Sequence, residues 1–293
     1  MTAPVARFAP SPNGYLHIGH AYSALLNQRF VNEHGGHLLL RIEDVDTTRA
    51  RPEFEQAIRD DLAWLGIAWE EPARRQSENV TDYHAALEKL GRMGVLYPCY
   101  CTRRDIRSAV GAAGDMQTDP DGSPIYPGTC RPSEAESLPD LSILRRSGRR
   151  HALRLNMNRA LELVSGPVAW REYREGEERC HAEFDPLRWG DVTVGRKDIG
   201  VSYHIAVTVD DHLQGITDVI RGEDLYSATA IHRVLQELLG FGAPNYRHHS
   251  LIRDAGEMKY SKSAGSQSLR AMREAGATLQ DIRLQLRAAG GKI

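Results

Sequence analysis

The strongest constraint on the fold is a short apolar strand that leads, through a loop rich in proline and glycine, into a long helix near the N-terminus. Residues 5–9 are typical of a buried strand, and two prolines and a glycine interrupt the pattern between residues 10 and 14. Apolar residues then recur at helical spacing from Ala21 to Phe30. The start of such a helix offers backbone N–H groups and the positive end of the helix dipole, so the segment predicts an anion-binding site.

Two basic motifs stand at opposite ends of the chain. His17 and His20 lie at the predicted loop–helix junction, where they could address one ligand or could be solvated side chains of an ordinary capped helix. The second motif, Lys259-Tyr260-Ser261-Lys262-Ser263, follows a strand-like segment at 249–252 and precedes a helical tail. Gly256 and Gly265 flank it and suit a loop that closes over a ligand.

Strands and helices alternate over most of the remaining chain. Further strands are predicted at residues 37–42, 202–211 and 216–221, and helices begin at about residues 52, 81 and 227. Carboxylates follow two of these strands, at Glu43 and at Asp210 with Asp211. Such alternation predicts a doubly wound α/β fold, which binds ligands beyond the carboxyl ends of its parallel strands.

The alternation is interrupted in the middle of the chain. Periodicity fades after residue 96, and strand-like pieces at 152–157 and 170–173 suggest a small antiparallel insert. We therefore predict an α/β fold with a split, Rossmann-type, doubly wound parallel sheet, a small α+β insert and a short helical C-terminal tail. The predicted boundaries are 1–95 and 196–248 for the two halves of the sheet domain, 96–195 for the insert, and 249–293 for the lysine loop and tail.

The charge balance limits how the chain could meet nucleic acid. A formal net charge of −2 leaves no global basic field, so an RNA site would have to be a local patch. Clusters of arginine could form one, although a solvated charged surface explains them equally well: Arg103, Arg104, Arg107, Arg145, Arg146, Arg149 and Arg150. We see no membrane span and no secretory signal, and four cysteines fit a reducing compartment, so we expect a cytoplasmic protein.

The two basic motifs together resemble those of the class I aminoacyl-tRNA synthetases. His17-Ile18-Gly19-His20 is similar to the HIGH motif, and residues 259–263 are similar to the KMSKS motif. Three further segments, at 7–12, 41–44 and 219–224, resemble the glutamyl/glutaminyl-tRNA synthetase subfamily, and the resemblance extends over most of residues 5–265.

This resemblance implies that ATP activates L-glutamate to glutamyl-adenylate, with Mg²⁺ carried on the nucleotide. The implied catalytic residues are His17, His20 and Lys262, and the implied ATP-binding residues are His17, Gly19, His20, Lys259 and Lys262. The family usually has Met or Leu where this chain has Tyr260. Glu43 would take the substrate ammonium, and the full implied glutamate site is Arg7, Phe8, Ala9, Pro10, Ser11, Glu43, Tyr203 and Arg221. Taken alone, Arg221 could be a surface salt bridge and Tyr203 a core residue.

The cysteines add a possible metal site. The spacing Cys99-x-Cys101 and Tyr126-x3-Cys130 could supply three thiolates and one oxygen to zinc, or the thiols could simply be buried. Cys180 stands apart and suits a small core residue. The same arrangement occurs in one branch of the subfamily, the glutamyl-queuosine tRNA(Asp) synthetases, and this resemblance implies one structural Zn²⁺ per chain, which would make the insert zinc-bearing.

Length also favours that branch. Only about thirty residues follow Ser263, too few for a second independent domain that reads an anticodon. The resemblance implies that adenylate forms without tRNA and that glutamate goes to queuosine at the wobble position of tRNA(Asp); we expect a monomer. Three alternatives remain at this point: a truncated synthetase that charges the 3′ end of tRNA(Glu), a catalytically inactive RNA-binding module, and a HIGH-type nucleotidyltransferase that acts on a small acid.

Overall fold

A seven-stranded sheet forms the centre of the computed structural model, which describes residues 3–112, 117–133, 141, 144, 148–174, 177–198, 200–252 and 267–293. The order across the sheet is β3-β2-β1-β9-β10-β6-β7. The bounds of these strands are β1 Val5–Phe8, β2 His37–Ile42, β3 Glu70–Arg75, β6 Ala169–Arg174, β7 Glu177–Glu183, β9 Asp218–Gly222 and β10 Asn245–His249. All neighbours run parallel except β7, which is antiparallel to β6, so the fold is α/β with a mostly parallel sheet.

The strand order places a ligand site at one point of the sheet. The chain moves outward from β1 to β2 and β3 on one side, and the later strands β9 and β10 add on the other side. The order therefore reverses between β1 and β9, where the connecting segments diverge. In open parallel sheets the crevice beyond the carboxyl ends of the strands at such a reversal binds ligands.

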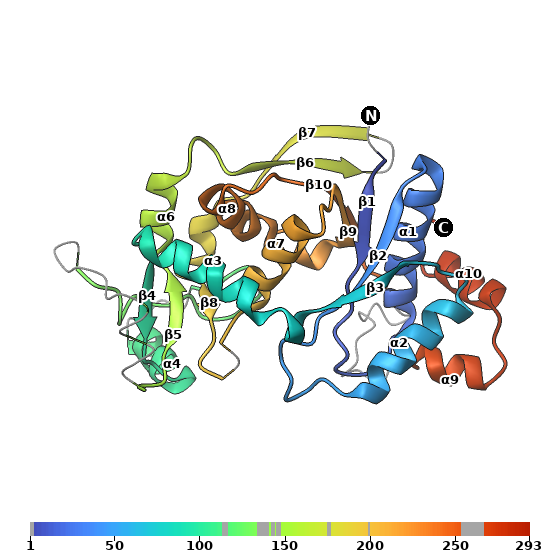
Figure 1. Ribbon diagram of the computed structural model, residues 1–293, viewed down its shortest axis with the longest axis horizontal. Coiled ribbons are helices and arrows are strands. Elements are labelled where there is room, and N and C mark those ends of the chain that lie inside the picture. The colour runs from blue at the N-terminus through green and yellow to red at the C-terminus, as the bar shows by residue number, and fades with distance from the viewer. Residues whose placement is uncertain are drawn as a thin grey trace.

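Helices cover the sheet in two groups (Figure 1). One group gathers beside β1 and β2 and consists of α1 Ile18–His34, α2 Pro52–Trp64, α9 Leu269–Glu274 and α10 Leu279–Ala288. The other consists of α3 Val80–Arg92, α6 Met157–Leu163, α7 Tyr203–Leu213 and α8 Thr229–Leu239. Along β9 the side chains alternate between faces, so Ile220 packs with the first group and Val219 contributes to a separate cluster with Trp170 and Tyr246.

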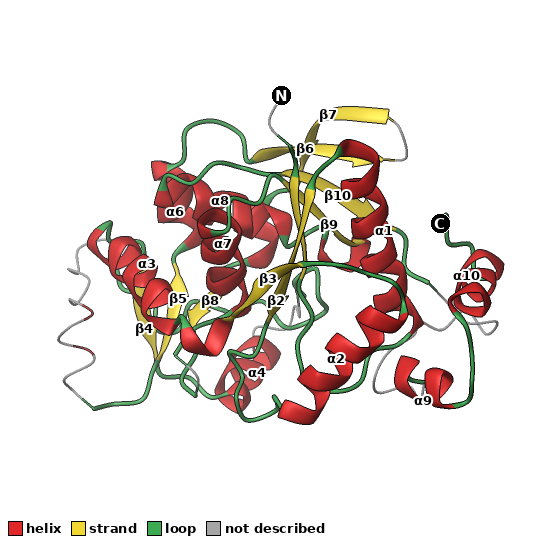
Figure 2. Ribbon diagram, turned by 45° about the vertical axis from the view of Figure 1, so that its right-hand side comes forward, coloured by secondary structure: helices red, strands yellow, loops and turns green. Residues whose placement is uncertain are grey.

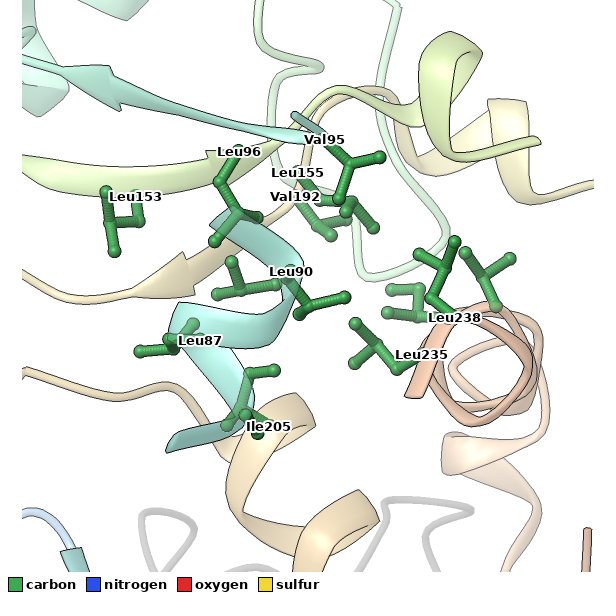
Figure 3. Close-up of a cluster of buried hydrophobic side chains, with 14 of the residues drawn as sticks. Leu87, Leu90, Val95, Leu96, Leu153, Leu155, Val192, Ile205, Leu235 and Leu238 are labelled. Carbon is green, nitrogen blue, oxygen red and sulfur yellow. The ribbon is translucent and has the colours of Figure 1, made fainter. Parts of the chain in front are cut away.

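A second, antiparallel sheet lies beside the second group of helices (Figure 2). Its order is β4-β5-β8, with bounds Leu96–Cys99, Ala152–Leu155 and Thr193–Gly195, and α4 Arg103–Ala112 follows β4. Figure 3 shows how leucines of α3 and α8 meet side chains of β4 and β5 in one buried cluster. Because this cluster is continuous, the small sheet is docked on the helices through apolar burial.

Short single-turn helices complete the described structure: η1 Gln76–Glu78, η2 Pro186–Trp189 and η3 Glu223–Leu225. Among the described ranges, no helix combines the length and apolar character that crossing a lipid bilayer requires.

Most predicted elements are confirmed, including the strands at 5–9 and 37–42, the helices from 52 and 81, and the amphipathic tail, in which Ile282 and Leu286 are buried. The strand predicted at 202–211 is wrong, because this segment forms helix α7. The helix is buried among α3, α8 and β8, and its residues from Ile205 to Asp211 are almost all inaccessible. A helix buried on every side shows the same continuous apolar run as a buried strand.

Two further boundaries also differ from the prediction. The strand expected at 249–252 lies earlier in the chain, as β10, and the one expected at 152–157 stops at Leu155 because Asn156 caps α6. The strand expected at 170–173 forms, but it extends the large sheet: Glu172 of β6 lies opposite Tyr246 of β10. Only β4, β5 and β8 make up the small antiparallel sheet.

Candidate active site

A cavity of about 570 Å³ lies at the reversal point between β1 and β9. Its walls come from the carboxyl ends of β1, β2 and β9, the start of α1, the start of α7 and the segment after β10. The lining brings together the residues that the sequence singled out for ATP and glutamate: Arg7, Phe8, Ala9, Pro10, Ser11, His17, Gly19, His20, Glu43, Tyr203 and Arg221. Lys259, Lys262, Tyr260 and the flanking glycines Gly256 and Gly265 lie outside the described residues.

The two histidines cap α1 with their own rings. The backbone N–H of Gly19 donates to Nδ1 of His17 over 3.1 Å, and the backbone N–H of His17 donates to Nδ1 of His20 over 3.1 Å. Both Nδ1 atoms are therefore acceptors, so a neutral ring carries its proton on Nε2. The ring centroids are 3.8 Å apart, which gathers the two rings at one end of the cavity.

This capping corrects one expectation about the anion site. The Gly19 N–H is bonded to His17, so it is not one of the unoccupied amides that the sequence predicts at this helix start. In neutral rings the Nε2–H groups of the two histidines are further hydrogen-bond donors at this helix start. A Cβ at Gly19 would lie 3.1 Å from Cε1 of His17, so a side chain there would push the imidazole ring by a few tenths of an ångström.

A cluster of paired charges lies under the cavity floor. Nε of Arg7 donates to Asp211 Oδ1 over 3.0 Å, and Nη1 of Arg41 donates to the same oxygen over 2.7 Å. Nη2 of Arg41 also reaches Glu43 Oε1 at 3.3 Å. Burial alone would raise the pKa of Asp211, but the two guanidinium groups outweigh it and hold that pKa below its ordinary value. Asp211 is therefore an anion that orients Arg7.

Glu43 is in the opposite electrostatic situation. Its side chain is 9% exposed, and burial raises the pKa of its carboxyl above the ordinary value even though Arg41 opposes the shift. A ligand cation at this position would favour the charged form. The sequence analysis did not assign Arg41 or Asp211 to the site, and it placed Asp211 at the end of a predicted strand. Each is a charged residue within or beside an apolar run, and this pattern could have indicated a buried charge at both positions.

Arg221 is a buried cation that has no counterion in the described part of the chain. It is 6% exposed and forms no ion pair within the described residues. Its partners are neutral acceptors on three sides: Nε2 of His248, Nδ1 of His232, and the oxygens of Thr229 and Leu225. The surface salt bridge considered above is therefore wrong for Arg221. A buried, unpaired charge beside a cavity is costly unless a ligand of opposite charge binds there.

Tyr203 faces the same cavity from the first residue of α7. It is 37% exposed, so the alternative of a core position is wrong. Burial of its hydroxyl raises the pKa of Tyr203 to about 12, so the phenol stays protonated at neutral pH and can donate a hydrogen bond.

The cysteines form a separate cluster beside the small sheet. The sulfur atoms of Cys99, Cys101 and Cys130 lie within 4.8 Å of one another and could hold a metal ion. The hydroxyl oxygen of Tyr126 is 3.5 Å from Cys99 Sγ and 3.7 Å from Cys101 Sγ, and it accepts the backbone N–H of Cys130 over 2.7 Å. The side chain of Cys180 lies outside the described part of the chain.

Two of these sulfur atoms lie at about the spacing of neighbouring ligands of a tetrahedral metal ion. Four ligands about 2.3 Å from such an ion lie about 3.8 Å apart, and the pair Cys101 Sγ and Cys130 Sγ is 3.5 Å apart. Burial raises the pKa of the Tyr126 phenol, so a metal would have to displace its proton to bind the oxygen. The guanidinium of Arg154 stacks 3.7 Å from the centroid of the Tyr126 ring and holds that ring in place.

Comparison with known proteins points to one family. The family described as tRNA synthetases class I (E and Q), catalytic domain, matches residues 5–290. A glutamyl-Q tRNA(Asp) synthetase of Rhodobacter capsulatus is 42% identical, covering 95% of this chain and 98% of that protein. A second protein with that name, from Nitratidesulfovibrio vulgaris, is 38% identical over 98% of this chain and 86% of its own length.

Solved structures agree on the fold. The crystal structure of a glutamate-tRNA synthetase from Elizabethkingia anophelis superposes with a TM-score of 0.73 at 29% identity. The match covers 94% of this chain and 54% of that one, so the chain spans about half the length of the solved synthetase.

Proposed function

This chain belongs to the class I tRNA synthetases for glutamate and glutamine, and on that premise we propose that it activates L-glutamate with ATP and transfers it to queuosine in tRNA(Asp). It is thus a ligase of the aminoacyl-tRNA synthetase type. The observation that carries the proposal is the charge arrangement of the cavity lining: two buried cations, Arg7 and Arg221, and one carboxylate, Glu43, whose side chain is 9% exposed. Glutamate complements it with two carboxylates and one ammonium. Asp224 also lines the cavity but is exposed to solvent.

Glu43 would accept a hydrogen bond from the substrate ammonium. The positive charge of the ammonium would stabilise the Glu43 carboxylate, whose pKa is raised by burial. Arg7 engages protein only through Nε among the described residues, so both of its Nη groups can serve a carboxylate. Arg221 and the Tyr203 hydroxyl would serve the other end of the substrate. Phe8, Ala9, Pro10 and Ser11 form the wall between these groups and the histidines.

Activation is an in-line displacement at the α-phosphorus of ATP. A glutamate carboxylate oxygen forms the new bond to phosphorus as the bond to pyrophosphate breaks, and charge develops on the phosphoryl oxygens. His17 and His20 would donate Nε2–H groups to those oxygens beside Gly19, and Lys259 and Lys262 would meet the leaving pyrophosphate. Mg²⁺ would travel with ATP and offset phosphate charge.

The described segment that follows the lysine motif in the chain contacts the histidine motif. The backbone N–H of Leu269 donates to the oxygen of Leu16 over 2.8 Å, and Ser268 pairs with His17 in an isolated antiparallel bridge. The described chain therefore re-emerges from the lysine-loop region directly beside the first histidine. This contact supports the proposal that Lys262 acts on the same nucleotide as His17.

The second step needs positioning more than acid–base chemistry. A hydroxyl of the queuosine cyclopentene-diol would attack the activated carbonyl and lose its proton. The bond between the carbonyl carbon and the bridging anhydride oxygen would break, and AMP would leave with that oxygen, which came from the glutamate carboxylate. We choose queuosine in tRNA(Asp) as the acceptor because of the two relatives named glutamyl-Q tRNA(Asp) synthetase, each of which is matched over most of its length. We also propose a cytoplasmic location, which ATP and tRNA as substrates support, and a monomer.

We further propose that Cys99, Cys101, Tyr126 and Cys130 hold one structural Zn²⁺ per chain. The convergence of three sulfur atoms and one phenol oxygen supports this assignment. Zinc would tie the end of β4 to the loop that carries Cys130. It would thus stabilise the small sheet within the predicted 96–195 insert, a range that also contains strands β6 and β7 of the large sheet. The other proposed units are the sheet halves 1–95 and 196–248 and the 249–293 tail.

The test is transfer of labelled glutamate to bulk tRNA from cells that make queuosine and from cells that do not. We expect label only on the queuosine-containing pool. Equal label on both pools would instead indicate charging of the 3′ end of tRNA(Glu). Absence of label together with absence of glutamate-dependent pyrophosphate exchange would favour an inactive RNA-binding module.

A further inference from the structure

A buried chain of hydrogen bonds runs from Glu172 through His248 to Arg221 across three neighbouring strands. These strands, β6, β10 and β9, lie side by side in the large sheet (Figure 1). Nδ1 of His248 is 2.9 Å from Glu172 Oε2, and Nε of Arg221 donates to Nε2 of His248 over 3.1 Å. Glu172 and His248 are 1% and 8% exposed, so neither can be explained as a surface group.

Arg221 determines which atom donates in each of these two hydrogen bonds. A guanidinium has five N–H donors and no acceptor, so Nε2 of His248 must accept. The proton of the neutral ring is then on Nδ1 and is donated to the Glu172 carboxylate. Glu172 also accepts from the backbone N–H of His248 and from Nε1 of Trp170, so it is surrounded by donors. Burial would raise its pKa, but the bonds from His248 prevail and lower it, which keeps Glu172 an anion.

The rest of Arg221 is held as firmly. Nη1 donates toward Nδ1 of His232 at 3.3 Å, and Nη2 donates to Thr229 Oγ1 at 2.7 Å and to the oxygen of Leu225 at 3.2 Å. Four of its five donors are thus used by protein. One hydrogen, on Nη1, has no partner among the described residues, and the guanidinium borders the cavity.

Arg7 and Arg221 differ in how the protein compensates the charge of the guanidinium, and the imidazole of His248 accounts for the difference. Arg7 bonds directly to the Asp211 carboxylate, which compensates much of its charge within the protein. Arg221 has no such direct bond within the described residues. The neutral imidazole of His248 lies between its guanidinium and the Glu172 carboxylate. The guanidinium is therefore oriented by hydrogen bonds while its charge stays available to a ligand anion.

We propose that Glu172 and His248 are positioning residues for substrate recognition: they hold the Arg221 guanidinium, uncompensated, against a carboxylate of the bound amino acid. The inference rests on the proposed function, since glutamate supplies that carboxylate. Neither residue is among those that line the cavity, so on this proposal both act through Arg221.

Two substitutions of His248 separate positioning from packing. His248→Gln retains an acceptor for Arg221 and a donor for Glu172, whereas His248→Leu retains only apolar bulk. We expect His248→Leu to raise the KM for glutamate in pyrophosphate exchange at least tenfold, and His248→Gln to raise it less than threefold. The KM for ATP should change less than twofold in both. If the role were packing, Leu would be the milder change.

Tyr246→Phe is the matched control. Its ring stacks on His248, but its hydroxyl bonds Gln236 outside the chain of bonds described here, so the KM for glutamate should stay within twofold of wild type. If His248→Leu does not fold, the ¹⁵N chemical shifts of the His248 ring in the wild-type protein still decide the matter. A proton on Nδ1 alone is expected, and a proton on Nε2 would overturn the inference.

The outcomes also distinguish this inference from the proposed function. Wild-type protein without glutamate-dependent exchange would refute the function. Wild-type exchange with equal effects of His248→Leu and His248→Gln, or with a milder effect of Leu, would refute the positioning role and leave the function intact.

Discussion

Replacing Glu43 by glutamine should weaken glutamate binding without weakening the fold. Glu43 is a carboxylate whose burial is unfavourable, as its raised pKa shows, and Arg41 is the described cation that stabilises its charge most, followed by Arg7. Glutamine removes that charge but keeps the size of the side chain. Arg41 keeps its bonds to Asp211 and to Gln214, so the substitution leaves no guanidinium unpaired.

The expected loss follows from the bond to the substrate ammonium. A hydrogen bond between charged groups contributes about 1.5–3 kcal/mol, and about 1.4 kcal/mol corresponds to tenfold in affinity. Glu43→Gln should therefore raise the KM for glutamate about 10- to 150-fold in pyrophosphate exchange, while the KM for ATP stays near the wild-type value.

Stability should respond in the other direction. A carboxyl whose folded-state pKa is raised binds its proton more tightly when folded, so its contribution to stability is lost as pH rises above the ordinary value. Glu43→Gln removes this loss, so its melting temperature at pH 8 should equal or exceed that of wild type. Glu162→Gln, at an exposed position on α6, is the control and should change neither quantity. An unchanged KM for glutamate, or a clear drop in melting temperature, would refute the assigned charge arrangement.

Three further predictions test other parts of the molecule. Lys262→Ala should lower kcat for pyrophosphate exchange about 10²- to 10³-fold with little change in glutamate binding, as for loss of one electrostatic contact to a transition state; an unchanged kcat would exclude Lys262 from the reaction. Cys101→Ser should reduce zinc, measured by elemental analysis, from one ion per chain to substoichiometric levels and lower the melting temperature; equal zinc in both proteins would contradict the proposed ligand set. Burial raises the pKa of Asp61 to about 6, so this group favours folding below about pH 4 and that contribution is lost as pH rises through 6. Asp61→Asn should flatten the dependence of melting temperature on pH between 4 and 7, and a slope identical to that of wild type would show that Asp61 does not titrate there.

Local pattern predicted much of the fold because most elements have one buried face. The spacing of apolar residues in 52–65 and in the C-terminal tail identified α2 and α10, and the proline–glycine break separated β1 from α1. The pattern failed at α7, because a helix buried among other helices loses the polar face that distinguishes it from a strand.

The sequence likewise identified some features of the candidate site and missed others. The motif residues at 7–11, 17–20 and 219–224 were visible in the sequence because each group is contiguous and follows a strand or starts a helix. Asp211 was visible as a residue but not as the partner of Arg7, since they are 204 positions apart and meet only when α7 packs beside β1. The wrong secondary structure at α7 hid this pairing.

Most local elements, the two basic motifs and the chemical types of the site residues can be inferred from the amino-acid sequence. Which charges are compensated depends on the folded arrangement: Arg7 lies against Asp211, whereas Arg221 is bonded to neutral groups and the imidazole of His248 separates it from Glu172. Electrostatic pairing depends on distance and burial, and the residues that meet at the sheet come from strands and helices far apart in the chain.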